Sequence, residues 1–139
     1  DYFPSVLKRV ANRLQRRGVV EISEAEGQWI VKITNKGRKE VLKYKWADFR
    51  PKSGKWDRKW RMVFFDVPEK EKRRRDDLRG FLKMLGMEQL QESVFVSPYD
   101  VSGEVRYLRE ILDVPHAVKL AVLESVENED ELKKIFGVR

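Results

Sequence analysis

Residues 60–126 alternate between short runs rich in β-branched and aromatic residues and longer runs with helical spacing. The first run, RMVFFDV, is apolar on both faces, which predicts a central strand that ends at Pro68. The next run, 69–86, predicts a helix that ends at Gly86, because its large apolar residues lie at i, i+3, i+4 and i+7. These residues are Leu78, Phe81, Leu82 and Leu85.

Four more elements are predicted after this helix: strands at 87–91 and 93–97, a helix at 103–113 and a strand at 116–126. A last short helix is expected at 128–136. Strand, helix, strand, strand, helix, strand within about 65 residues is the ferredoxin-like βαββαβ order, an antiparallel sheet with both helices on one face. We therefore expect a ferredoxin-like domain over 60–139, and α+β as the fold class.

The segment 4–17 predicts a helix with one apolar and one basic face. Pro4 suits its first turn, and Gly18 lies where a helix commonly stops. No acidic residue interrupts the polar face. Its members are Lys8, Arg9, Asn12, Arg13, Gln15, Arg16 and Arg17. The apolar stripe consists of Val6, Leu7, Val10, Ala11 and Leu14.

The strands VVEIS and QWIVKIT then predict a hairpin closed by the turn EAEG, and a helix capped by Thr34 or Asn35 is expected up to Trp46. Helix, hairpin and helix in this order resemble the latter part of a winged helix-turn-helix over residues 1–46. In that interpretation the first helix reads duplex DNA, with Asn12, Arg13 or Gln15 reaching base edges, and the hairpin with Lys32 is the wing. The alternative is that the arginines form a solvated face on a helix that only packs on the hairpin.

Residues 47–59 lose periodicity and gather Pro51, Ser53 and Gly54, which predicts a linker. Three tryptophans flank or interrupt it, and their expected role is to anchor it on the neighbouring domain rather than to stack on nucleic-acid bases. They are Trp46, Trp56 and Trp60.

The net charge of +7 makes a polyanion, and first of all nucleic acid, the partner to consider. The chain has no cysteine, which excludes disulfides, thiolate catalysis and cysteine-based zinc sites and fits a cytoplasmic location. No apolar stretch approaches the roughly 20 residues of a membrane-spanning helix, so no membrane partner is expected. The sequence begins at Asp1 instead of methionine, and we expect it to be a fragment that lacks an upstream element.

The run VFFDVPEKEKRRRDDLRGFLKMLGMEQLQESVFVSP resembles the ferredoxin-like subunit of CRISPR spacer-acquisition complexes. Preceded by VLKRVANRLQRRGVVEI and ITNKGRKEVL, nearly the whole chain is similar to the PaaX-like family of phenylacetic-acid-catabolism repressors, which join a winged helix to such a domain. The resemblance implies a homodimeric repressor. The sequence departs from the family by lacking the helices ahead of the recognition helix and the additional C-terminal domain, so no effector is assigned.

In the CRISPR-associated relatives, the aspartate that matches Asp66 pairs with its copy across a two-fold axis and binds a divalent metal. The resemblance thus implies a metal-dependent endonuclease with Mg²⁺ as cofactor. The alternative is that Asp66 accepts backbone N–H bonds at the strand-to-helix turn, as aspartates commonly do. One carboxylate is a poor Mg²⁺ site, and no second acid lies at a convincing spacing.

The remaining candidate residues indicate no catalytic site. The dense cluster of cations at the start of the second-half helix either contacts phosphate or stays solvated. It consists of Lys70, Lys72, Arg73, Arg74 and Arg75. His116 has no serine or cysteine partner in view, and no nucleophile is assigned.

The leading hypothesis is a DNA-binding transcriptional regulator that uses no cofactor, binds double-stranded DNA and dimerises through residues 60–139. The second hypothesis is the endonuclease or spacer-acquisition subunit acting through Asp66. A third is a DNA-architecture protein that reads no sequence.

Overall fold

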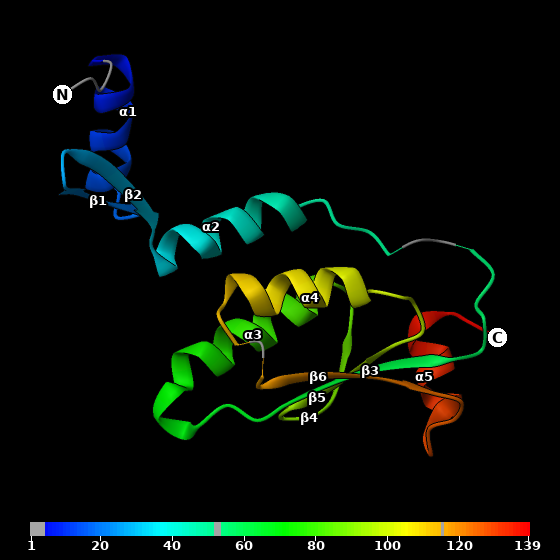
Figure 1. Cartoon of the computed structure of the whole chain (residues 1–139). Helices are drawn as coiled ribbons and strands as arrows, with labels where there is room; N and C mark the ends of the chain where they lie inside the picture. The colour runs from blue at the N-terminus through cyan, green and yellow to red at the C-terminus, as the bar shows by residue number, and fades with distance from the viewer. Residues whose placement is uncertain (1–4, 52–53, 115) are drawn as a thin grey trace. The chain divides into compact units, whose positions relative to one another are not determined.

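The computed structural model describes residues 5–51, 54–114 and 116–139 and divides into two compact units, Asp1–Lys45 and Trp46–Arg139. Within the described residues it contains five α-helices, one short 3-10 helix and two antiparallel sheets (Figure 1). Pro4, expected in the first turn of the first helix, and Ser53, expected in the linker, lie outside the described residues. No helix in the described part of the chain is long and apolar enough to cross a bilayer.

The first unit consists of a helix, a hairpin and most of a second helix. Helix α1 (Ser5–Arg16) ends where Gly18 takes a φ of +79°, as the sequence predicts. Strands β1 (Val20–Ala25) and β2 (Gln28–Ile33) pair antiparallel. Glu26 and Gly27 both have positive φ, 51° and 74°, which is the geometry of a two-residue type I′ turn.

Thr34 is the residue that starts α2 (Asn35–Trp46), and it decides between the two caps that the sequence allows. Its Oγ1 accepts the N–H of Gly37 at 3.1 Å and donates to the carbonyl of Gly18 at 2.6 Å. One hydroxyl therefore satisfies an otherwise unpaired helix N–H and also fixes the end of α1 against the start of α2.

The apolar stripe predicted on α1 is present, but it is largely uncovered. Only Ala11 is buried, while Val6, Leu7 and Val10 are exposed. Periodicity identifies the stripe correctly, but no element of the first unit covers Val6, Leu7 and Val10.

The second unit contains a four-stranded antiparallel sheet with the strand order β4-β5-β3-β6. Strand β3 lies between two neighbours, so the predicted central position of this strand is confirmed. The element order is the βαββαβ order expected for this half, followed by one more helix. The elements are β3 (Trp60–Phe65), η1 (Glu69–Glu71), α3 (Lys72–Met84), β4 (Glu88–Gln91), β5 (Val94–Ser97), α4 (Ser102–Ile111), β6 (Val118–Leu123) and α5 (Glu129–Phe136).

Helices α3 and α4 lie on the same side of this sheet (Figure 1). Because side chains alternate along a strand, Val63 and Phe65 of β3 point to one face, and both are buried. Phe65 stacks on Phe95 of β5, with ring centroids 6.2 Å apart. The predicted inner face of α3 is confirmed, since Leu78, Phe81, Leu82 and Leu85 are all buried.

The opposite face of the sheet has a second, smaller core. Trp60 and Val96 lie there together with Leu132 of α5 and Trp56, and all four are buried. The indole N–H of Trp60 donates to Glu129 Oε1 at 2.8 Å. Helix α5 therefore covers one end of this face.

The three tryptophans anchor the connecting segment, as expected, and are too buried to stack on bases. Trp46 contacts Phe81 and Tyr107 edge to face, at 6.1 and 6.2 Å, and Trp56 lies 4.8 Å from Trp60. The indole N–H of Trp56 also donates to the carbonyl of Lys59 at 2.8 Å. The last part of the predicted linker is thus packed into the second unit.

Candidate nucleic-acid interface

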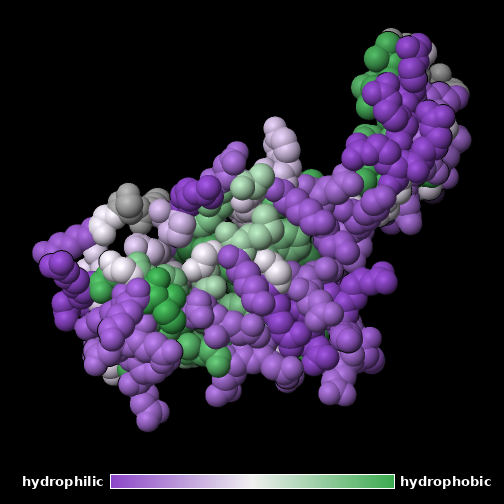
Figure 2. All heavy atoms as spheres, turned by 180° about the vertical axis from the view of Figure 1, so that it is seen from behind, coloured by the Kyte–Doolittle hydropathy of each residue, from purple (hydrophilic) through white to green (hydrophobic). Residues whose placement is uncertain are grey.

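The polar face of α1 is exposed. All seven predicted side chains on it are exposed, and Arg9, Asn12, Gln15 and Arg16 line a shallow hollow of about 460 Å³. This hollow contains two guanidinium groups, which pair with phosphates, and two groups able to donate and accept hydrogen bonds. Figure 2 shows hydrophilic side chains over much of the part formed by α1 and the hairpin, with hydrophobic ones along one edge.

The cations of this face are not equivalent. Arg17 Nη2 lies 2.8 Å from Glu40 Oε2 of α2, so Arg17 is already paired. The ammonium of Lys8 lies 5.8 Å from the ring centroid of Trp29 on β2, a cation–π contact that holds it beside the hairpin. Arg9, Arg13 and Arg16 are the cations of α1 best placed to meet phosphate oxygens.

The hairpin is a weaker candidate for DNA contact than the sequence predicts. Lys32 is exposed, but it lies directly opposite Glu21 in the β1–β2 ladder. Glu24 and Glu26 lie at the tip, on either side of Ala25. Because these carboxylates repel phosphates, the tip does not suit a wing that follows a DNA backbone.

The positive charge of the chain is concentrated in the first unit. Residues 1–45 contain 11 Lys and Arg against 5 Asp and Glu, a net charge of +6, whereas residues 46–139 contain 19 against 18, a net charge of +1. The polyanion-binding potential of this chain therefore lies in the unit that contains α1.

Asp66 follows the end of β3 and is exposed. Its backbone N–H donates to the carbonyl of Ala117 at 3.0 Å, but its carboxylate has no hydrogen bond or ion pair within the described residues. Within the described residues no such bond to this side chain is present, so its role as an acceptor of backbone N–H bonds stays a prediction. Among the described residues, no group of three or more His, Cys, Asp and Glu is arranged to hold a metal ion.

The cationic cluster before and within α3 is only partly free. Arg74 lies 3.9 Å from Glu71 Oε1 and donates to the carbonyl of Asp113 at 3.3 Å. Arg75 is half-buried, and its Nε has no hydrogen-bond partner among the residues that the structure describes. The exposed members are Lys70, Lys72 and Arg73.

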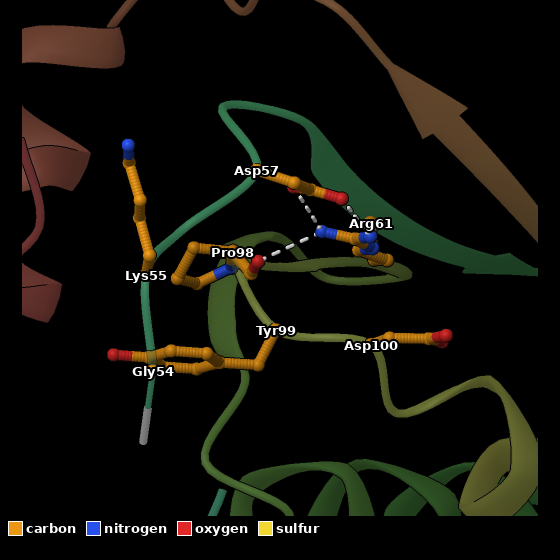
Figure 3. Close-up of a pocket in the computed structure, with 7 residues that line it drawn as sticks. All are labelled: Gly54, Lys55, Asp57, Arg61, Pro98, Tyr99 and Asp100. Carbon is orange, nitrogen blue, oxygen red and sulfur yellow. Dashed lines mark hydrogen bonds and ion pairs between the residues drawn. The ribbon is translucent and has the colours of Figure 1, made fainter. Parts of the chain in front are cut away.

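Sequence reasoning does not find an ion-pair site that lies where the connecting segment meets the sheet (Figure 3). The guanidinium of Arg61 contacts both carboxylate oxygens of Asp57 and donates to the carbonyl of Pro98 at 2.9 Å. The hydrogen bonds from Arg61 and from the backbone of Lys59 lower the pKa of Asp57 to about 2. The spacing of Asp57 and Arg61, four residues apart, is the one signal in the sequence that could have indicated the pair.

A second carboxylate lies near this guanidinium. Asp100 Oδ1 accepts the hydroxyl of Ser102 at 2.5 Å and its N–H at 3.0 Å, and these bonds, with a smaller contribution from Arg61, lower the pKa of Asp100. Every charged group of the Arg61 site except Lys55 is thus held by its neighbours, so the site fastens residues 54–59 to the loop after β5. The role of this site is therefore structural.

These features define a mixed α/β protein with a strongly basic first unit and a near-neutral second unit. The chain belongs to the family described as the PaaX protein central Cas2-like domain, which matches residues 53–135. No curated protein and no solved structure matches the chain.

Proposed function

We propose that this chain is a DNA-binding transcription regulator of repressor type. Its first unit is the latter part of a winged helix-turn-helix, and its second unit is a ferredoxin-like domain through which two copies pair. Membership of the PaaX family supports this function. The βαββαβ order and the antiparallel strand order support the ferredoxin-like assignment.

The observation that carries the proposal is the exposed polar face of α1, which contains cations and amides and no carboxylate. A helix of this kind enters the major groove, where Arg9, Arg13 and Arg16 neutralise phosphates on its flanks. Asn12 and Gln15 have the donor and acceptor pair that recognises adenine at its groove edge. Phosphate contacts supply the affinity, and the amides supply the sequence preference.

The exposed part of the sheet supports dimerisation. Phe64 is exposed near the end of the central strand β3, directly opposite Val94 on one side and Lys119 on the other. Met62 and Ala121 lie on the same face, and both are partly exposed. An apolar surface on a central strand favours burial against a second sheet. Phe64→Asp is expected to shift the sedimentation of the chain from dimer to monomer, while Val122→Asp, at the edge strand, leaves the dimer intact.

The DNA-binding test uses a labelled duplex titrated at several salt concentrations. Changing Arg9, Arg13 and Arg16 together to alanine is expected to remove about three phosphate contacts, which lowers the slope of log K against log salt by about 2.7 for each bound chain. The matched control changes Lys83, Arg106 and Lys134, three exposed cations of the second unit, and keeps the net charge equal. Equal losses in the two variants would show that α1 does not contact DNA.

A second function rests on the free carboxylate of Asp66. We propose as the alternative a Mg²⁺-dependent endonuclease in which two copies of Asp66 meet across a dimer. The exposure of this carboxylate, its lack of a partner among the described residues and the Cas2-like family support it. The test incubates RNA and duplex DNA with Mg²⁺ or Mn²⁺. Cleavage that disappears in Asp66→Asn, with the dimer retained, would favour the endonuclease. If the wild-type chain cleaves neither nucleic acid, the DNA-binding regulator, which uses no cofactor, is the function that stands.

A further inference from the structure

The two amides on the polar face of α1 lie three residues apart, and this spacing limits the DNA sequence that they can read. Asn12 and Gln15 are both exposed, and both line the hollow that Arg9 and Arg16 also line. They are the uncharged members of a seven-residue face whose other five members are cations. The helical backbone of α1 fixes the separation of the two amides.

Amides and cations on this face suit different parts of a duplex. A guanidinium gains the same energy beside the phosphate of any nucleotide, so the contacts of Arg9, Arg13 and Arg16 do not depend on sequence. A carboxamide has an acceptor oxygen and a donor nitrogen, which match the N6 donor and the N7 acceptor of adenine. Guanine presents only acceptors at these two positions, so the carboxamide oxygen would stay unpaired against it. Asn12 and Gln15 therefore each favour adenine.

The cations of α1 require the helix to lie along the groove. Arg9, Arg13 and Arg16 are spread over two turns of α1, and all three are exposed. Only a helix that follows the groove brings all three to phosphates. The same orientation places the side chains of Asn12 and Gln15 inside the groove, whereas a helix that entered by its first turn would leave both amides outside.

Helix geometry then decides which base pairs the two amides reach. Residues three apart are separated by about 4.5 Å along a helix and by about 60° around it. Neighbouring bases of a strand are about 3.4 Å apart along the duplex axis, and the next ones about 6.8 Å. The separation of Asn12 and Gln15 is therefore closer to one base-pair step than to two. Recognition residues three apart on a helix do contact successive bases, principally on one strand.

We propose that α1 reads two adenines in neighbouring base pairs of the same DNA strand, one through Asn12 and the other through Gln15. This inference rests on the proposed DNA-binding function and names the sequence that this function selects. The ligand is a duplex with an ApA step, which is TpT on the opposite strand. Arg9, Arg13 and Arg16 supply affinity that is equal for all sequences, and the two amides determine the specificity.

The experiment first selects duplexes that bind the full chain from a library with a randomised segment. The selected duplexes are expected to share an ApA step. Replacing either A·T pair of this step by G·C is expected to weaken binding by about tenfold or more. Replacing one adenine by 7-deazaadenine keeps the base pair but removes the N7 acceptor, which is expected to weaken binding by about two- to tenfold, because one hydrogen bond is lost.

Alanine variants connect each adenine to one amide. Asn12→Ala is expected to abolish the effect of 7-deazaadenine at one adenine and to keep it at the other, and Gln15→Ala is expected to give the reverse. A merely structural role of these residues would weaken all duplexes equally and leave both effects in place. Alanine favours the helix at exposed positions, so both variants stay folded, which circular dichroism verifies. The matched control is Gln91→Ala, which removes an exposed amide from β4 of the second unit and keeps both effects.

Selected duplexes without two adjacent adenines on one strand would overturn the inference. Effects of 7-deazaadenine that persist at both adenines in both alanine variants would also overturn it. The salt slope of the variant that lacks Arg9, Arg13 and Arg16 separates these failures from failure of the DNA-binding proposal. A slope lowered relative to wild type, without an ApA preference, would show that α1 binds duplex DNA but does not read adenines.

Discussion

Glu40→Gln is expected to strengthen DNA binding, because Glu40 holds Arg17 of the α1 face in an ion pair. Arg17 Nη2 lies 2.8 Å from Glu40 Oε2, and the two side chains are 54% and 42% exposed. A pair this exposed contributes about 0–1 kcal/mol to stability, so its loss leaves the fold intact. In the variant Arg17 is free to meet a phosphate, which adds about 0.9 to the salt slope for each bound chain.

The assay is a duplex titration between about 50 and 200 mM salt, the range over which phosphate contacts change affinity most visibly. The matched control is Glu110→Gln, which removes the same charge from an exposed position on α4 of the second unit. Equal changes in slope for Glu40→Gln and Glu110→Gln would refute the reasoning, because they would reduce the effect to net charge. Adding Arg17→Ala to Glu40→Gln is expected to return the slope to its original value.

Four further substitutions test the fold. A Cβ added at Gly37 would lie 2.2 Å from the carbonyl oxygen of Val19, so Gly37→Ala is expected to lower the free energy of unfolding in urea by about 1–3 kcal/mol. A Cβ added at Gly80 in α3 meets no atom within 4 Å, so Gly80→Ala is expected to raise that free energy by about 0.5–1 kcal/mol. Trp60 is fully buried, so Trp60→Ala is expected to cost about 3–5 kcal/mol, and a loss below about 1 kcal/mol would contradict the second core. The pKa of Asp57 is lowered to about 2, so its carboxylate stabilises the fold above its ordinary pKa of 3.8 and loses this contribution as the pH falls to about 2. After solvent screening, the stability difference between wild type and Asp57→Asn is expected to be about 1 kcal/mol at neutral pH and to vanish over that acid range.

The order of elements is predictable from the sequence because each one depends on a local pattern. The leucine spacing of α3 and the unbroken apolar run of β3 fix those elements, and the structure confirms both. The choice between Thr34 and Asn35 as cap stays open in the sequence, since either side chain can accept the N–H. The contact of the Thr34 hydroxyl with Gly18, 16 residues away, decides it.

Features that depend on distant partners are not predictable in this way. Periodicity indicates which side of α1 is apolar, but not whether anything covers it, and Val6, Leu7 and Val10 stay exposed. The site around Arg61 escapes notice because its acceptor at Pro98 is 37 residues away and Asp57 lies in a segment that loses periodicity. Asp66 shows the same limit, since a residue type that favours turns makes no side-chain hydrogen bond in the described part of this turn.

The uneven placement of charge has a consequence for assembly. Two chains that approach each other through residues 46–139 meet almost no Coulomb barrier, so weak apolar contacts suffice to hold them together, and added salt changes that association little. Their remaining portions repel each other unless a polyanion lies between them. In the proposed dimer, nucleic acid acts as the counterion that allows the two basic first units to lie close to one another.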